Sequence, residues 1–132
     1  MLALLDTHAL IWYLYDDPRL SEKAREMLEK AASTNGRVGC SALTLAEVIY
    51  LQEKDRIPAG TLDRLLESLK TKSSLLVVAP VTLAVVVLMR SIPQTEVPDL
   101  PDRIIAATAL QLNVPLISRD RKIRVSRVST IW

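Results

Sequence analysis

The stretch LALLDTHALIWYL, residues 2–14, places a carboxylate between two apolar runs. The apolar run 2–5 predicts a buried strand, and residues 9–17 predict a short helix. An unpaired buried carboxylate costs free energy, so Asp6 should have a partner, cap a helix or bind a metal. The rest of the sequence has to decide among these three roles.

Strands and helices alternate along the remaining chain. Short apolar segments predict strands at 37–41, 75–79 and 115–118, with a fifth strand at 128–132. Apolar spacing, caps and prolines predict helices at 21–33, 43–54, 58–72, 81–91 and 102–113, with a loop at 96–101. This alternation predicts an α/β fold: a three-layer α/β/α domain with a mainly parallel central sheet of about five strands.

Size and composition fit one folded unit. The chain has 132 residues, 49% hydrophobic and 24% charged, which is typical of an ordered globular protein. We therefore expect a single domain over residues 1–132. The longest apolar stretch, 75–89, contains Pro80 and is shorter than the roughly 20 residues of a membrane-spanning helix. A strand, a turn and a buried helix explain it better, so we expect a cytoplasmic protein without membrane contact.

Four acidic residues from distant parts of the chain fall at the same predicted edge of the sheet. Asp6 ends the first strand, and Glu47 lies near the start of the helix after the second. Asp102 is in the first turn of the helix before the fourth strand, and Asp120 follows that strand by two residues. Parallel sheets bind ligands beyond the carboxyl ends of their strands. We expect the four carboxylates to converge there.

Three of these acids have structural explanations of equal simplicity. Asp6 could cap the helix that follows it. Asp99 and Asp102 could both serve the positive end of their helix, and Asp120 could be a turn residue. Sequence alone leaves these alternatives open.

Glu47 fits a structural role least well. It follows Thr44 by three residues, which is the spacing of a capping box. However, it is the only charged residue between positions 38 and 52, and apolar side chains share its helical face. A carboxylate in such a face favours a nearby cation.

Grouped carboxylates repel one another unless a cation neutralises them. Oxygen ligands suit Mg²⁺ or Mn²⁺, and a chain with one His and one Cys offers little for zinc. Such a metal activates water and stabilises charge on a phosphate oxygen. The sequence thus favours phosphodiester hydrolysis, with Asp6, Glu47, Asp102 and Asp120 as candidate catalytic residues.

A basic segment, residues 118–127, lies close to these acids in sequence. It carries five cations against a single Asp120: Arg119, Arg121, Lys122, Arg124 and Arg127. By itself it predicts a solvated hairpin or strand edge. Beside a carboxylate site it could hold a phosphate backbone, and Arg119, Arg121 and Lys122 are the candidates for contacts with that backbone.

Several motifs together carry a family resemblance. The segments LLDTHALIWYL (4–14), SALTLAEVIYL (41–51), PDLPDRIIAATALQLNVPLISRD (98–120) and the closing IW resemble the PIN-domain family. More narrowly, they resemble the ribonuclease toxins of VapBC-type toxin–antitoxin pairs. The resemblance spans nearly the whole chain in order.

The resemblance implies roles for individual residues. Asp6 and Asp102 would be the principal metal ligands, and Glu47 and Asp120 would complete the acidic pocket. Asp99 belongs to a variable part of the motif. The family further implies a parallel five-stranded sheet, a homodimer, an RNA substrate, and an antitoxin whose C-terminal segment covers the active groove.

Other residues have plainer interpretations. A metal-bound water supplies the nucleophile, so His8 need not act as a base, and we expect it to pack or cap at the helix start. Thr7 and Ser118 are hydroxyls that could hold carboxylates or water. Trp12 and Tyr13 could stack on bases, but a core or interface role is expected.

Three other classes of protein share part of this pattern. A phosphoacceptor receiver needs an Asp at the end of its third strand, where this chain has VVAPV. A haloacid-dehalogenase-type phosphatase needs a second Asp where His8 stands. The remaining alternative is a catalytically silent PIN-like scaffold that binds RNA or protein.

Overall fold

The computed structural model describes residues 1–71, 74–124 and 126–132. Its centre is a five-stranded sheet in the order β3-β2-β1-β4-β5. The strands are β1 (Ala3–Leu5), β2 (Val38–Ser41), β3 (Leu76–Ala79), β4 (Leu116–Ile117) and β5 (Thr130–Ile131). All neighbouring pairs are parallel. The predicted α/β fold with a mainly parallel sheet is therefore confirmed.

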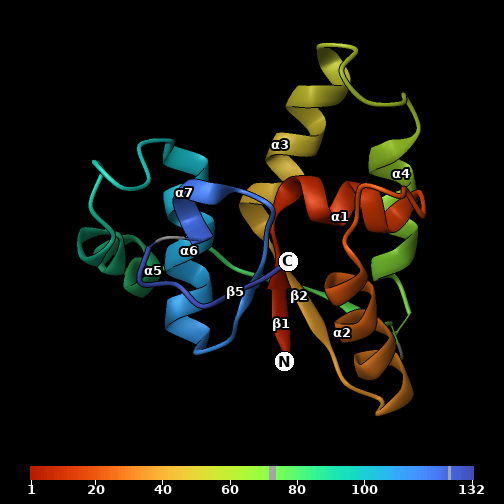
Figure 1. The fold of residues 1–132 in the computed structure, drawn as a ribbon. Coiled ribbons are helices and arrows are strands. Elements are labelled where there is room, and N and C mark those ends of the chain that lie inside the picture. Colours follow the sequence, from red (N-terminus) through yellow and green to blue (C-terminus); the bar gives the residue numbers. More distant parts are fainter. Residues whose placement is uncertain (72–73, 125) are drawn as a thin grey trace.

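Helices cover both faces of this sheet, which gives the three expected layers (Figure 1). Helices α1, α2 and α4 lie on one side, and α5, α6 and α7 lie on the other. Helix α3 rises from the end of β2. The bounds are α1 (Thr7–Leu14), α2 (Glu22–Ser33), α3 (Ala42–Glu53), α4 (Thr61–Leu69), α5 (Leu83–Leu88), the 3₁₀ turn η1 (Met89–Ser91), α6 (Leu100–Leu112) and α7 (Arg121–Arg124).

Two hydrophobic cores hold these layers together. Side chains alternate along β1, so Ala3 and Leu5 enter the core beneath α1 and α2. Leu4 enters the opposite core, which includes Ile105 from α6 and Ile123 from α7. The strand is buried on both faces, as its continuous apolar run predicts.

Parallel pairing aligns the ends of the central strands. Leu5 is in register with Cys40 of β2 and with Ile117 of β4. The Asp6 N–H then donates to the Ile117 carbonyl at 3.1 Å. The residues that follow these three strands therefore leave the sheet at the same edge.

Three predictions about helix limits need correction. Helix α1 spans Thr7–Leu14 rather than residues 9–17, because Asp6 is its N-cap. Helix α4 begins at Thr61 rather than Pro58, and position 72 of the predicted helix lies outside the described residues. Helix α6 begins at Leu100 rather than Asp102 because Asp99 is its N-cap. The helix ends at Asn113, as predicted, and this C-cap residue has the left-handed conformation, with φ of 54°.

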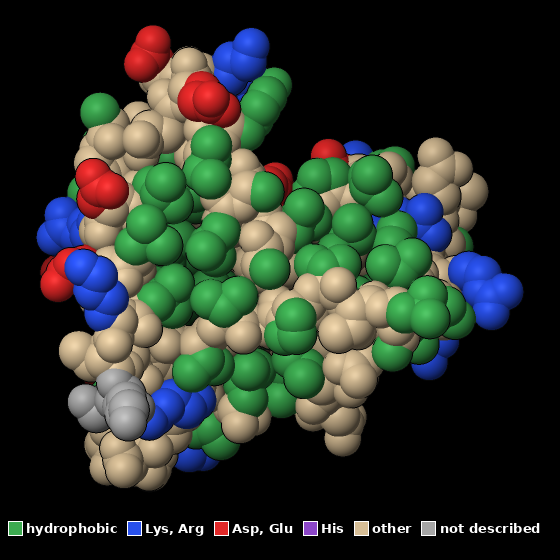
Figure 2. Space-filling view, turned by 180° about the vertical axis from the view of Figure 1, so that it is seen from behind, with side chains coloured by type: hydrophobic (Ala, Val, Ile, Leu, Met, Phe, Trp, Pro, Cys, Tyr) green, Lys and Arg blue, Asp and Glu red, His purple; other side chains and the backbone are tan. Residues whose placement is uncertain are grey.

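The expectation that the helix at 81–91 is buried is also wrong. It forms as the short helix α5 followed by η1, and its apolar residues are largely exposed. Leu83 is 79% exposed, and Val86 and Val87 are each 47% exposed. Hydrophobic side chains are spread over much of the face seen in Figure 2. Apolar composition alone could not show that no further layer of the described chain covers this helix.

The basic segment differs from its prediction too. Residues 121–124 form helix α7 instead of a hairpin or strand edge, because Ile123 packs into the core beneath α6. Within the described residues, no helix is long and apolar enough to cross a membrane.

Candidate active site

Asp6 lies where β1 gives way to α1. Its Oδ1 accepts a hydrogen bond from the Ala9 N–H at 2.8 Å, so Asp6 is the N-cap of α1. Burial raises the pKa of the Asp6 carboxyl, and hydrogen bonds from Ser118 and the Ala9 N–H act against this rise. The capping role proposed from sequence is real, but it occupies only part of a carboxylate that also faces a pocket.

Asp102 is in the first turn of α6, and its own N–H donates to the capping Asp99 Oδ1 at 3.0 Å. Burial raises the pKa of Asp102 to about 7, with further contributions from the negative charges of Asp99 and Asp120. Asp99 thus explains the helix start, which leaves the Asp102 side chain without a capping function.

Asp120 connects β4 to α7. Its N–H donates to the Ser118 Oγ at 3.1 Å, and its Oδ1 accepts from the Lys122 N–H at 2.8 Å. A hydrogen bond also joins its side chain to Asp102 and contributes to the raised pKa of Asp102. Asp120 therefore orders the start of α7 and at the same time contacts a second carboxylate.

Glu47 lies on α3 beside the start of α1. Its Oε1 accepts a hydrogen bond from the Thr7 hydroxyl at 2.6 Å, and the Thr7 and Thr44 hydroxyls are 3.2 Å apart. Burial raises the pKa of Glu47, and the Thr7 hydrogen bond acts against the rise. The N-cap of α3 is Ser41, so the capping box based on Thr44 is wrong.

The structure brings three of the four predicted acids to one small pocket. A cavity of about 230 Å³ is lined by Asp6, His8, Trp12, Asp102, Arg119 and Asp120. Glu47 does not line it but lies close enough for its charge to affect Asp102. Among the described residues, ion pairs join Arg19 to Asp17, Arg25 to Asp16 and Lys70 to Glu67 only. The four acids of the site are therefore without an ion-pair partner in the described chain.

The chemistry of this pocket fits a hard divalent cation. Its donors are carboxylate oxygens, and their mutual repulsion contributes to the raised pKa of Asp102. As the side chains stand, no group of three or more His, Cys, Asp or Glu in the described ranges is arranged as a ready ligand set. The carboxylates would have to turn towards one another to hold a bound ion together.

Arg119 enters this pocket from the basic segment. Its guanidinium carbon lies 4.6 Å from the centroid of the Trp12 ring. Arg121 and Lys122 are exposed in the first turn of α7, next to Asp120. The sequence did not show that Arg119 would be held against an aromatic ring, since 107 positions separate it from Trp12.

Trp12 packs in the core, as expected, and is only 4% exposed. Its ring contacts Trp132 at a centroid distance of 5.7 Å and His8 at 5.9 Å. His8 was expected to pack or to cap at the helix start. It does not cap α1, because Asp6 is the cap, but its ring packs beside Trp12 while the residue stays exposed and lines the pocket. Thr7 was correctly identified as a hydroxyl near the carboxylates, and Ser118 hydrogen-bonds Asp6.

Comparisons with known proteins agree with this architecture. Ribonuclease VapC22 of Mycobacterium tuberculosis is 28% identical over 137 positions, covering 98% of this chain and 97% of that protein. VapBC2 from Rickettsia felis, bound to a DNA fragment from its promoter, has a TM-score of 0.74 at 19% identity, covering 98% of this chain and 97% of that one.

Two further solved structures share the fold. A toxin–antitoxin complex from Klebsiella pneumoniae has a TM-score of 0.69 at 24% identity, and FitAcB from Neisseria gonorrhoeae has 0.64 at 24%. Each covers 98% of this chain and 96% of the matched one. The model of the PIN domain matches residues 3–128. The chain therefore belongs to the PIN-domain family.

Proposed function

We propose that this protein is an endoribonuclease that hydrolyses RNA phosphodiester bonds and needs Mg²⁺ or Mn²⁺. The observation that carries the proposal is the pocket in which Asp6, Asp102 and Asp120 meet without an ion-pair partner in the described chain. The similarity of the protein to a ribonuclease, over nearly the whole chain, supports RNA as the substrate.

Asp6 and Asp102 are the proposed metal ligands, and Glu47 and Asp120 complete the acidic pocket. When bound, the metal lowers the pKa of a water molecule and stabilises negative charge on the phosphate. The protein contributes orientation: Ser118 and the Ala9 N–H hold Asp6, and the Thr7 hydroxyl holds Glu47. Such supporting hydrogen bonds orient carboxylates that bind a metal.

RNA binding is assigned to the cations beside this pocket. Arg119 lines the pocket, and Arg121 and Lys122 extend the positive charge along α7. A guanidinium can donate two hydrogen bonds to one phosphate, whereas a lysine contributes mainly charge. We therefore assign the basic segment to holding the RNA backbone beside the reacting phosphate.

We further propose that the chain is the toxin of a type II toxin–antitoxin pair and acts in the cytoplasm, where its RNA substrate is found. The solved neighbours include a toxin–antitoxin complex, which supports an antitoxin partner. Residues 1–132 would form one domain, since the family match spans 3–128. A homodimer is proposed through α5, because Leu83, Val86 and Val87 expose apolar surface that a second copy would bury.

The test is cleavage of single-stranded RNA with and without EDTA. We expect activity in Mg²⁺ or Mn²⁺, none in excess chelator, and a loss of at least about 100-fold in Asp6→Asn and in Asp102→Asn. Asp63→Asn is the matched control, because Asp63 is an exposed acid in the first turn of α4. Both site variants should melt no lower than wild type, since each substitution reduces repulsion.

The alternative is a silent scaffold that binds RNA or protein. It predicts RNA binding without cleavage in either metal and equal behaviour of Asp6→Asn and Asp63→Asn. Cleavage that continues unchanged in EDTA would contradict the metal-dependent mechanism.

A further inference from the structure

A second hollow adjoins the acidic pocket. This groove has a volume of about 580 Å³, within the range of ligand pockets (roughly 300–1,000 Å³). Its lining includes His8, Trp12, Tyr15, Asp17, Arg19 and Arg56. His8 and Trp12 line both hollows, so they form the wall that the two share.

One arginine lies against this wall in each hollow. The guanidinium carbon of Arg119 is 4.6 Å from the Trp12 ring centroid, and that of Arg19 is 5.2 Å from it. Arg119 lines the acidic pocket, and Arg19 lines the groove. Two guanidinium groups that contact one ring are within reach of neighbouring phosphates on one strand.

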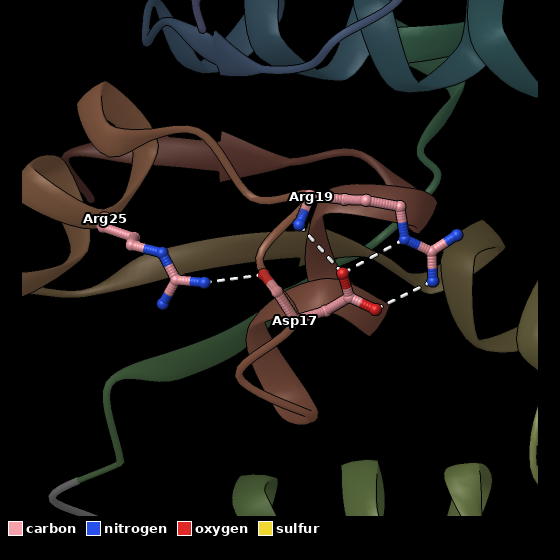
Figure 3. A network of polar contacts seen from close by, with 3 residues as sticks. All are labelled: Asp17, Arg19 and Arg25. Carbon is pink, nitrogen blue, oxygen red and sulfur yellow. Dashed lines mark hydrogen bonds and ion pairs between the residues drawn. The ribbon is translucent and has the colours of Figure 1, made fainter.

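Arg19 is held in a fixed position. Its Nε and Nη2 groups donate to the two carboxylate oxygens of Asp17 at 3.1 and 2.8 Å, and its backbone N–H donates to Asp17 as well (Figure 3). Arg25 in turn donates to the Asp17 carbonyl at 2.6 Å, which anchors this turn. The Arg19 side chain nevertheless remains 61% exposed.

The pair with Asp17 leaves donors unused. A guanidinium has five N–H groups, and Asp17 accepts from the side-chain groups Nε and Nη2. No other acceptor in the described chain hydrogen-bonds the Arg19 side chain. Because Arg19 is already oriented, little conformational entropy is lost when its remaining donors bind an anion.

The charge of the groove suits an anion. Asp17 is its single acidic lining residue and is paired with Arg19, whereas Arg56 lines the same groove and forms no ion pair among the described residues. The groove therefore carries net positive charge directly beside the pocket proposed for cleavage.

We propose that Arg19 is a phosphate-binding residue for the RNA strand that leaves the acidic pocket over Trp12 and enters this groove. The inference rests on the proposed endoribonuclease function and extends its substrate path beyond the basic segment at 119–127. Arg119 contacts the phosphate next to the cleaved bond, and Arg19 contacts one further along the strand.

Arg19→Gln tests this path against Arg64→Gln. Arg64 is the matched control. Like Arg19 it is an exposed arginine beside an aromatic ring, with its guanidinium carbon 4.7 Å from the Tyr15 ring centroid, but it does not line the groove. Both changes are made in an Asp6→Asn background, and binding of labelled single-stranded RNA is followed by fluorescence anisotropy over a salt series. Gel electrophoresis checks that the RNA stays intact.

We expect Arg19→Gln to weaken binding of an RNA of about ten nucleotides roughly tenfold, and Arg64→Gln to have no effect. The slope of log affinity against log salt should fall by about 0.7 for the lost phosphate contact. A dinucleotide, which is too short to reach the groove, should bind Asp6→Asn and Asp6→Asn/Arg19→Gln equally. Asp6→Asn/Arg119→Gln should bind both RNAs more weakly.

Equal affinities and slopes for Arg19→Gln and Arg64→Gln would overturn the inference and leave the groove as a surface for a peptide. If wild type cleaves RNA in that case, the proposed function still stands. If wild type neither binds nor cleaves RNA, the proposed function fails and the role of Arg19 fails with it.

Discussion

The acidic pocket and the outer face of α5 have opposite solvation: charged groups are withdrawn from water in the pocket, and apolar groups are exposed to water on α5. At the pocket, Asp6 is buried and Asp102 is half-buried, and neither has an ion-pair partner in the described chain, so burial raises the pKa of both carboxyl groups. On α5, apolar side chains are exposed, with Leu83 at 79%. One region calls for a cation and the other for an apolar surface. Each unfavourable environment indicates the kind of partner that would relieve it.

Glu47→Gln gives the largest effect among the remaining tests. Glutamine keeps the size of the side chain and can still accept from Thr7, but it contributes no charge to the acidic pocket. RNA cleavage should fall about 10- to 100-fold. Added Mg²⁺ or Mn²⁺ should raise its melting temperature less than that of wild type, because stabilisation by a ligand follows affinity for the folded state.

Thermal melts with and without metal, beside a cleavage assay, check this expectation. Without metal, the variant should be at least as stable as wild type, since repulsion with Asp6, Asp99 and Asp102 falls. Equal metal-induced shifts and equal cleavage would limit Glu47 to a structural role on α3.

Charges placed on α5 test the opposite region. Leu83→Asp/Val87→Asp should convert the proposed dimer to a monomer, because burying two carboxylates in an apolar interface costs several kcal/mol. Light scattering during size-exclusion chromatography measures the mass. Leu66→Asp, at a 41% exposed position on α4, is the control and should leave the mass unchanged. A wild-type monomer, or a dimer that survives the double change, would exclude α5 as the interface.

Replacing Asp17 should give the smallest effect. Its pKa is shifted in the opposite direction from those of the pocket acids. Its hydrogen bonds to Arg19 lower the pKa of its carboxyl from 3.8 to about 2. A lowered folded-state pKa stabilises the fold above the unfolded pKa, and this stabilisation is lost as the pH falls through the folded pKa. The stability difference between wild type and Asp17→Asn should therefore be constant above about pH 5 and shrink towards pH 2. Thermal melts over this pH range would contradict the pairing if the difference stayed constant.

Much of the fold and of the site followed from sequence for a clear physical reason. Continuous apolar runs such as 2–5 are buried on both faces, and alternating helices force them into a parallel sheet. Parallel strands end at one edge, so Asp6, Asp102 and Asp120 could be placed in one pocket from their positions after or before strands. The position of an acid relative to a strand end was enough to predict its place, because all the strands run in the same direction.

Tertiary structure decided what local spacing leaves open. Thr44 and Ser41 are both able to cap α3, and the backbone selects Ser41. The apolar residues of α5 resemble those of a core helix, and only the absence of a covering layer in the described fold exposes them. Trp12 meets Arg19 and Arg119 because α1, the turn after it and the end of β4 converge in space. The sequence determined which side chains the protein places at the edge of its sheet. Three-dimensional packing determined which of these side chains contact each other, because such contacts depend on distances between elements that a local sequence pattern does not give.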